Sequence, residues 1–346
     1  MNKKIAVLGT GANGSCTAAD LIKADCDVTL IDQWPAHIEA MRANGLRIDM
    51  PGRELQVPVR AYHLCDVCRL NQTFDVVLLA MKAYDARWAS EFIKPYLARD
   101  GLLVGLQNAM TAELIAEVVG RSRTLGCVVE LSSELFTPGV VRRNTPPEKT
   151  WFGLGSLDPS MDGRLAEIEQ LLRNVGKVSI TPNVLAAKWM KLVVNTMCLG
   201  PFAIVGLSMA DAVRLPGMRE LFLRIGQEAL DVGQDLGYGI EPIFGLKPED
   251  IRGANRPLEK LFDKLASDIG GRSPRNCVLQ DIHKGRYSEV DLVNGLVVEE
   301  SKRLGKSAPA NAMVVELTRQ IHAGVLKPNP SNMALAHEML ANAPLA

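Results

Sequence analysis

Two polar residues interrupt an otherwise apolar helical stretch, "KWMKLVVNTMCLG", which covers residues 188–200. Lys191 and Asn195 are four positions apart, so on a helix they share one face, with Cβ atoms about 5–6 Å apart. An ammonium beside a carboxamide could donate a proton and a hydrogen bond to a substrate carbonyl, as a general acid does. Lys188 lies near the same face, and the spacing alone does not choose between the two lysines. A lysine that merely extends to solvent is the structural alternative.

A second polar cluster, "QDIHKGRYSEVDLVNG", covers residues 280–295. Ser288 is predicted to cap a helix N-terminus, with Asp291 three positions later as in a capping box. Glu289 falls in the first turn of that helix. A carboxylate there could simply complement the helix dipole, which is a common structural role.

The stretch "AVLGTGANGS" has the glycine pattern of a dinucleotide-binding turn. Gly9 permits the tight turn, Gly11 lets the backbone approach a pyrophosphate, and Gly14 lets helix and strand pack closely. Free N–H groups at the helix N-terminus favour phosphates, so Ala12 and Asn13 are also candidate cofactor-binding residues. A glycine-rich turn without a nucleotide is the alternative, but the motif follows a predicted strand and opens a helix, as the nucleotide site requires.

Asp32 ends the second predicted strand, 18 residues after Gly14. A carboxylate at that position accepts hydrogen bonds from the adenosine ribose and repels a 2′-phosphate. The next five residues, "QWPAH", contain no Arg or Lys, and His37 among them is interpreted as a surface residue. We therefore expect NAD(H) to be preferred, with NADP(H) possible if an arginine from another loop lies nearby.

Lys82 and Asn108 end the third and fourth clear strands. Ligands of doubly wound sheets bind at the carboxyl ends of the strands, so both residues are predicted to point toward the cofactor crevice. The alternatives are a helix-capping or solvated role for Lys82 and a turn-forming role for Asn108.

The chain is predicted to consist of a dinucleotide-binding Rossmann domain (1–184) and a mainly α-helical substrate or catalytic domain (185–346). The first half alternates apolar β-type runs with helical patterns, which predicts an α/β fold with a doubly wound parallel sheet. The strands are expected at 4–9, 27–32, 74–82, 100–108, 124–131 and 150–156, and the helices at 15–24 and 35–45. The later helices are expected at 185–199, 216–236, 257–269, 289–304 and 309–324, with a loop at 270–276 and a partly loose tail after Pro328.

Composition narrows the function classes. The 346 residues include 39 basic and 39 acidic side chains. A formal net charge of zero argues against nucleic-acid or polybasic membrane-surface binding. No apolar run reaches the roughly 18–20 residues of a membrane span, and no secretory signal is predicted. Seven scattered cysteines suggest reduced thiols in a cytoplasmic protein. Cys65 and Cys68 form the one close pair. A metal site there would need a second pair or spaced histidines, and neither a metal nor a redox role is favoured from the sequence.

Several motifs together resemble the ketopantoate reductase family (2-dehydropantoate 2-reductases). They are "GTGANG", "MKAYD", "LQNAM", "KWMKLVVNT" and "LQDIHKGRYSEVDLVNG", and the resemblance runs from about residue 4 to about 320. It implies a Rossmann domain followed by a helical domain like the C-terminal domain of 6-phosphogluconate dehydrogenase, with the site between them. It also implies that the protein is an oxidoreductase that uses a nicotinamide cofactor and a small-molecule substrate, often as a homodimer.

The resemblance also implies roles for individual residues. Lys191 would be the catalytic lysine, in preference to Lys188. Asn195 and Glu289 would contact the substrate, and Glu289 would complete the catalytic site. Asn108 would lie near both nicotinamide and substrate, and Lys82 would contact the cofactor.

Three positions depart from the family pattern. Leu199 replaces a second helix asparagine, Cys277 replaces a serine that often binds the substrate carboxylate, and Asp32 lies where typical members bind a 2′-phosphate. A substrate pocket that lacks the asparagine amide and the serine hydroxyl at positions 199 and 277 loses discrimination for polar substrates. We therefore predict a bulkier or more apolar 2-keto acid, ketone or secondary alcohol as substrate. The alternatives are a genuine 2-dehydropantoate 2-reductase of pantothenate synthesis and a non-catalytic NAD(H) sensor.

Overall fold

The computed structural model describes residues 3–247, 249, 257–269 and 274–342. The chain divides into two compact units, Met1–Leu185 and Ala186–Ala346, and the boundary falls within the first turn of helix α6 (Val184–Cys198). The cofactor-binding and catalytic roles assigned above to residues 1–184 and 185–346 stay predictions.

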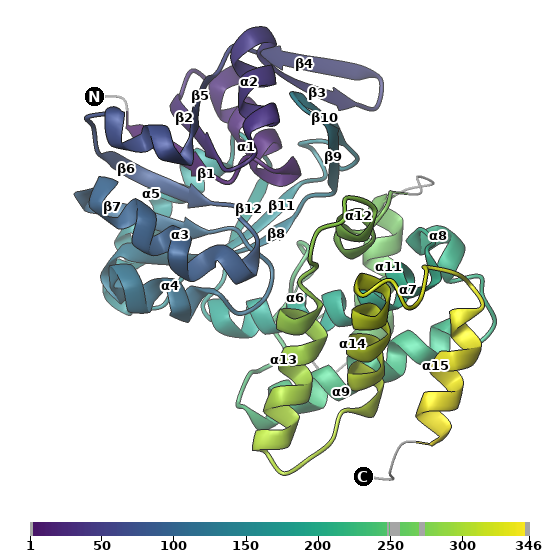
Figure 1. The fold of residues 1–346 in the computed structure, drawn as a ribbon. Helices are drawn as coiled ribbons and strands as arrows, with labels where there is room; N and C mark the ends of the chain where they lie inside the picture. The colour runs from purple at the N-terminus through teal and green to yellow at the C-terminus, as the bar shows by residue number, and fades with distance from the viewer. Residues whose placement is uncertain (1–2, 248, 250–256, 270–273, 343–346) are drawn as a thin grey trace. The chain divides into compact units, whose positions relative to one another are not determined.

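The first unit is built on an eight-stranded sheet with the order β12-β11-β8-β7-β6-β1-β2-β5 (Figure 1). The predicted doubly wound sheet is confirmed, except that β11 pairs antiparallel with β8. The order reverses between β1 and β6, and such a switch point is where sheets of this class bind ligands. The strands are β1 (Lys4–Leu8), β2 (Asp27–Asp32), β5 (Arg60–His63), β6 (Phe74–Leu79), β7 (Leu97–Gly105), β8 (Thr124–Glu130), β11 (Trp151–Ser156) and β12 (Lys177–Ile180).

Helices cover both faces of this sheet, as its nearly continuous apolar strands require. Along β1, Ile5 and Val7 belong to one buried cluster and Ala6 and Leu8 to another, because successive side chains of a strand point to opposite faces. The first cluster includes residues of α1 (Ala12–Lys23), α2 (Pro35–Asn44) and α5 (Asp162–Leu172). The second includes residues of α3 (Ala86–Ile93) and α4 (Ala112–Val119).

A second, four-stranded sheet has the order β4-β3-β10-β9 and packs on α1. Its strands are β3 (Leu46–Met50), β4 (Arg53–Val57), β9 (Ser133–Thr137) and β10 (Val140–Arg143). The sequence did not predict this sheet. β3 and β10 pair in parallel although they are far apart in the chain, and β4 is largely exposed and polar.

The second unit is helical, as predicted, and its long α14 contacts α7, α9, α13 and α15. The tail after Pro328, which was expected to be partly loose, is helical over Asn332–Ala341. The expected loop at 270–276 lies partly outside the described residues. None of the helices that the structure describes is long and apolar enough to cross a membrane. The elements after α6 are α7 (Gly200–Val205), α8 (Met209–Ala212), α9 (Met218–Asp235), α11 (Pro257–Ile269), α12 (Cys277–His283), α13 (Val290–Arg303), α14 (Pro309–His322) and α15 (Asn332–Ala341).

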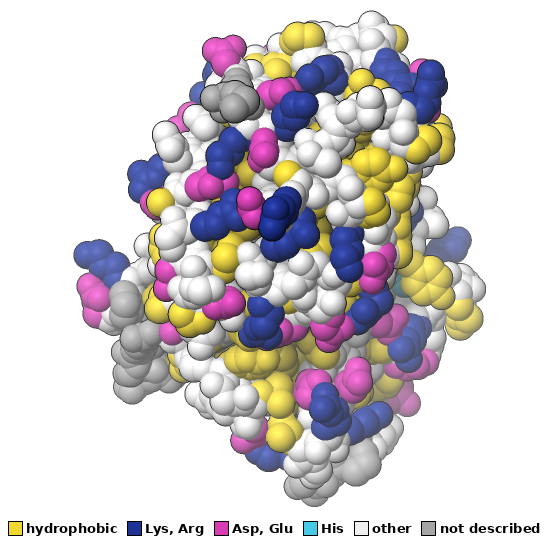
Figure 2. Space-filling model, turned by 90° about the vertical axis from the view of Figure 1, so that its left-hand side faces the viewer, with side chains coloured by type: hydrophobic (Ala, Val, Ile, Leu, Met, Phe, Trp, Pro, Cys, Tyr) yellow, Lys and Arg dark blue, Asp and Glu magenta, His cyan; other side chains and the backbone are white. Residues whose placement is uncertain are grey.

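The charged surface is mixed in sign. On the face seen in Figure 2, basic and acidic side chains alternate over short distances, with apolar side chains between them. This arrangement matches the balanced composition of the chain.

Candidate functional site

The glycine-rich turn joins β1 to α1 at the switch point of the sheet. Gly9 has φ +95°, and a Cβ atom there would lie 2.5 Å from the Met81 backbone nitrogen. A Cβ on Gly14 would overlap the Gly9 carbonyl, so strand and helix approach as closely as the motif predicts. Gly11, in contrast, has nothing within 4 Å of its Cβ position, so this side of the turn is open.

The first turn of α1 has backbone N–H groups that could donate hydrogen bonds to an anion. Its first i→i−4 bond runs from the Ser15 N–H to the Gly11 carbonyl. The amides of Ala12, Asn13 and Gly14 therefore lie outside the helical ladder. Together with the open side of Gly11, they fit a pyrophosphate group, which is the chemistry that the sequence predicted here.

Asp32 ends β2 with its carboxylate against the same turn. One oxygen, Oδ2, accepts the Thr10 N–H at 2.6 Å and is 3.2 Å from the Thr10 hydroxyl, while Oδ1 accepts the Trp34 N–H at 2.8 Å. The residue is 8 % exposed. A carboxylate oxygen can accept more than one hydrogen bond, so the group can hold the turn and still accept from ribose hydroxyls. The sequence did not suggest the bond from Thr10.

His37 was interpreted as a surface residue, and this is wrong, because the side chain is fully buried. Its Nδ1 accepts the Gly139 N–H at 2.9 Å, which leaves the ring proton on Nε2, 2.9 Å from the Thr10 carbonyl. The ring also stacks on Trp34 with centroids 5.6 Å apart. His37 therefore fixes the back of the glycine-rich turn to the β9–β10 turn, and it is not a surface partner for a 2′-phosphate.

Lys82 and Asn108 follow neighbouring strands at the same edge of the sheet. Both residues were predicted to end their strands, and this is wrong. β6 ends at Leu79 and β7 at Gly105, so Lys82 and Asn108 each lie in a loop, three residues beyond the strand. Lys82 precedes the short 3-10 helix η2 (Ala83–Asp85) without a side-chain cap. Since β1, β6 and β7 are adjacent, the two loops follow the strands next to the glycine-rich turn.

Helix α6 contains the predicted polar pair, Lys191 and Asn195, four positions apart. Lys191 is half-buried, and its Nζ lies 4.8 Å from the centroid of the Phe244 ring, a cation–π contact. Phe244 has φ +61°, a costly conformation for a bulky residue and one that the local sequence does not reveal. Lys188 is more deeply buried, at 3 % exposed.

Asn195, one turn after Lys191, has a side-chain amide nitrogen without a hydrogen-bond partner among the described residues. The residue is 4 % exposed, and among the described residues nothing accepts a hydrogen bond from its buried Nδ2. Leaving such a donor unpaired costs about 1–3 kcal/mol, so a buried unpaired amide in a native fold calls for an explanation, such as a missing ligand.

Glu289 is buried, at 4 % exposed, and occupies the N-cap position of α13. The predicted cap by Ser288 is wrong, because the Ser288 hydroxyl lies 2.9 Å from His322 Nε2. Burial lowers the pKa of His322, so at neutral pH the ring is uncharged and shares a hydrogen bond with the Ser288 hydroxyl. The ring also stacks on Tyr287. Ser288, the residue before Glu289, is thus hydrogen-bonded to α14 and not to the first turn of α13.

Leu199 and Cys277, two of the departures from the family pattern, contact the same small apolar cluster. This cluster consists of Ala203, Val278 and Leu279, with Leu199, Cys277 and Ile282 partly buried against it. Asn276 links α12 to the end of α6. Its Oδ1 accepts the Leu279 N–H and so caps α12, and its Nδ2 donates to the Cys198 carbonyl at 3.4 Å.

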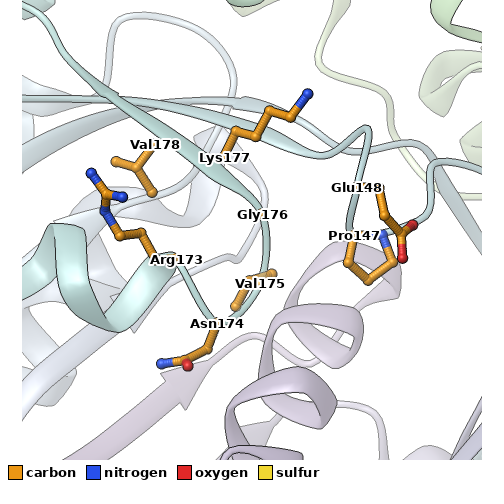
Figure 3. A pocket seen from close by; sticks show the side chains of 8 residues that line it. All are labelled: Pro147, Glu148, Arg173, Asn174, Val175, Gly176, Lys177 and Val178. Atoms are coloured by element: carbon orange, nitrogen blue, oxygen red, sulfur yellow. The ribbon is translucent and has the colours of Figure 1, made fainter.

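A surface hollow of about 510 Å³ in the first unit is lined by Pro147, Glu148 and residues 173–178 (Figure 3). The charged ends of Glu148, Arg173 and Lys177 point in different directions there. Arg173 pairs with Glu169, and Glu148 with Arg53. This hollow contains none of the predicted site residues.

The two parts of the chain match the two models of one protein family. Residues 5–156 match the family described as ketopantoate reductase PanE/ApbA, and residues 183–322 match its C-terminal part. The 2-dehydropantoate 2-reductase of Mesorhizobium japonicum is 27 % identical over 341 residues, which cover 92 % of this chain and 97 % of that protein.

Solved structures agree with this match. A PanE/ApbA family ketopantoate reductase from Ralstonia eutropha JMP134 is 27 % identical, with a TM-score of 0.76, and the match covers 93 % of this chain and 99 % of that one. D-mandelate dehydrogenase, solved with NADH and anilino(oxo)acetate, shares the fold at 21 % identity, with a TM-score of 0.80 and the same coverage. The resemblance inferred from the motifs is confirmed: the chain belongs to the ketopantoate reductase family of oxidoreductases.

Proposed function

We propose that this protein is an NAD(H)-preferring oxidoreductase that interconverts a 2-keto acid or ketone carrying an apolar group with the corresponding secondary alcohol. The observation that carries the proposal is on α6, where the unpaired amide of Asn195 lies one turn from Lys191. The chain also belongs to a family of oxidoreductases. The open glycine-rich turn and Asp32 support a dinucleotide as the cofactor.

The bound nicotinamide would supply or accept the hydride. Lys191 would donate a proton to the substrate oxygen during reduction and accept it during oxidation. Asn195 Nδ2 would donate a hydrogen bond to the substrate, which would satisfy that amide. Glu289 would accept from a substrate hydroxyl or orient Lys191, and Asn108 would hold the substrate near the cofactor. Lys82 would contact the cofactor.

Asp32 is proposed to set the cofactor preference. Replacing Asp32 with Ser removes the charge that would repel a 2′-phosphate, so we expect the kcat/KM ratio of NADH to NADPH to fall by about tenfold or more. Steady-state assays at 340 nm with both cofactors measure this ratio. Some loss of stability is also expected, because the carboxylate holds Thr10 and Trp34.

Asp27→Ser is the matched control. Asp27 begins the same strand and pairs with Arg60, so this change removes the same charge at the opposite end of β2. Its cofactor ratio should equal that of the wild type. An unchanged ratio in Asp32→Ser would remove Asp32 from cofactor discrimination.

Leu199 and Cys277 are proposed to select an apolar substrate. The double variant Leu199→Asn, Cys277→Ser restores two hydrogen-bonding groups, and we expect it to raise kcat/KM for 2-dehydropantoate relative to an aromatic 2-keto acid by about tenfold or more. Kinetics with both substrates, each at saturating NADH, provide the comparison.

Ile282→Asn adds an amide elsewhere on the same apolar cluster and controls for a general change of polarity. It should leave the ratio of the two substrates unaltered. If the double variant also leaves it unaltered, the two positions do not line the substrate site.

Genuine 2-dehydropantoate 2-reductase activity is the second candidate, because the relative from Mesorhizobium japonicum has that name. A screen of 2-keto acids and secondary alcohols at 340 nm tests all the alternatives. The highest kcat/KM on 2-dehydropantoate would favour the second candidate, whereas NADH binding without turnover of any substrate would indicate a sensor. We also propose a cytoplasmic homodimer, which light scattering and cell fractionation can test.

A further inference from the structure

Two thiols lie on one face of the turn that follows β5. Cys65 and Cys68 are both exposed and belong to the 3-10 helix η1 (Leu64–Arg69). Side chains three positions apart eclipse in a 3-10 helix, and three rises of about 2 Å put their Cα atoms about 6 Å apart. This separation lies within the range of about 4.4–6.8 Å found in disulfides. Cys68 Sγ also points back along the turn, 3.4 Å from the Cys65 carbonyl oxygen.

No other thiols among the described residues have this combination of exposure and pairing. Cys16, Cys127 and Cys198 are buried, and the partly exposed Cys26 and Cys277 are in different units. The pKa of Cys26 is raised by partial burial and by the neighbouring Asp25, which makes it a poorer nucleophile at neutral pH.

The turn that carries Cys65 and Cys68 borders the cofactor end of β2. The preceding residue, His63, is the strand partner of Asp32 in the β2–β5 register. Val67, between the two cysteines, is fully buried in the same cluster as Ile31, which precedes Asp32. Asp66 forms an ion pair with Arg42 of α2, at 2.9 Å.

We propose that Cys65 and Cys68 are a reversible redox pair that closes an intramolecular disulfide and thereby weakens cofactor binding; the second part rests on the proposed function. With a peroxide as oxidant, one thiolate takes up an oxygen atom to form a sulfenic acid and releases a first water or alcohol. The second thiol then attacks that sulfur and releases a water. Overall, two thiols lose two electrons and two protons, the peroxide O–O bond breaks, and one S–S bond forms.

The effect on the cofactor follows from the contacts of the turn. A disulfide draws the two Cβ atoms to about 3.8 Å, which moves the backbone of Asp66 between them. Arg42 then loses Asp66 and keeps its bonds to Glu39 and to the Ala61 carbonyl, so α2, which begins three residues after Asp32, is held less firmly. Losing one exposed ion pair corresponds to a rise of about threefold in the NADH dissociation constant.

The test treats the full-length protein with hydrogen peroxide and maps its peptides by mass spectrometry without reduction. We expect a peptide with residues 65 and 68 cross-linked, which dithiothreitol reverses. NADH titration by fluorescence is then compared between the reduced and the oxidised protein. Cys65→Ser and Cys68→Ser should each abolish the cross-link and the change in affinity, whereas Cys26→Ser should keep both.

The outcomes separate this proposal from the proposed function. Absence of the 65–68 cross-link overturns the redox pair whatever the enzyme does. A cross-link with unchanged NADH affinity overturns the effect on the cofactor. Failure of the reduced protein to bind NADH contradicts the proposed function, and the cross-link would still decide the redox chemistry.

Discussion

Replacing Lys191 with Met is expected to lower kcat by about 10²-fold or more in both directions, because the variant has no proton to exchange with the substrate oxygen. Methionine keeps most of the length of the lysine side chain and removes its charge. The dissociation constant for NADH should stay within about twofold, since the cofactor-binding residues proposed here belong to the other unit. Steady-state turnover at 340 nm and NADH fluorescence titration measure the two quantities.

Lys188→Met is the matched control, because it removes the neighbouring lysine of the same helix. Its kcat should remain close to that of the wild type once the folded fraction is corrected by circular dichroism, although burial of Lys188 makes some loss of stability expected. If Lys188→Met loses turnover and Lys191→Met keeps it, the proton transfer belongs to the earlier lysine. If both keep it, no lysine of this face takes part.

The sequence predicted best those parts of the fold that have a local pattern. β2 and α11 have the predicted bounds, because their apolar residues repeat with the period of a strand and of a helix and clear breakers flank them. The glycine-rich turn was predicted together with its reasons, since each glycine meets a steric demand that is local to the βα unit.

Long-range pairing accounts for most of what was missed. The second sheet depends on the contact of β3 with β10, which no local periodicity can reveal. The burial of His37 depends on the Thr10 carbonyl and the Gly139 amide, 27 and 102 residues away. The sequence analysis named no helix in the tail, where α15 is held by a hydrogen bond from Asn332 Nδ2 to the Ile204 carbonyl, 128 residues away.

The same reasoning applies to the candidate site. The residue types and their spacing on α6 predicted the shared face of Lys191 and Asn195, but the unpaired state of the Asn195 amide could be seen only in the fold. The contact of Leu199 and Cys277 with one cluster, 78 positions apart in the chain, likewise depends on how α7 and α12 pack.

Arg143→Met is expected to lower the free energy of unfolding by about 3–5 kcal/mol, because it leaves the buried carboxylate of Asp20 without its partner. Arg143 is fully buried, its Nη1 lies 2.5 Å from Asp20 Oδ2, and its other nitrogens donate to Thr145, Thr150 and Val175. Urea unfolding followed by circular dichroism measures the loss.

The adjacent Arg142 provides the control. Its side chain is 62 % exposed and lies 3.8 Å from the buried Glu134 carboxylate, which is too far for a hydrogen bond, so Arg142→Met should cost clearly less than Arg143→Met. An equal loss of unfolding free energy in the two variants would show that the buried Arg143–Asp20 pair stabilises the fold no more than the contact of Arg142 does.

The pH dependence gives an independent check on the same pair. Burial already raises the pKa of Asp20, and Arg143 opposes this rise, so removing the guanidinium raises the pKa further. A carboxyl that binds its proton more tightly when folded favours the folded state at low pH, and this contribution is lost as the pH rises through the folded pKa. The deficit of Arg143→Met should therefore be largest at neutral pH and shrink toward pH 4. The double variant Asp20→Leu, Arg143→Met should recover part of the stability and lose this pH dependence, because no carboxyl remains at this site to titrate. The recovery is partial because Thr145, Thr150 and Val175 still lack the hydrogen bonds from the guanidinium.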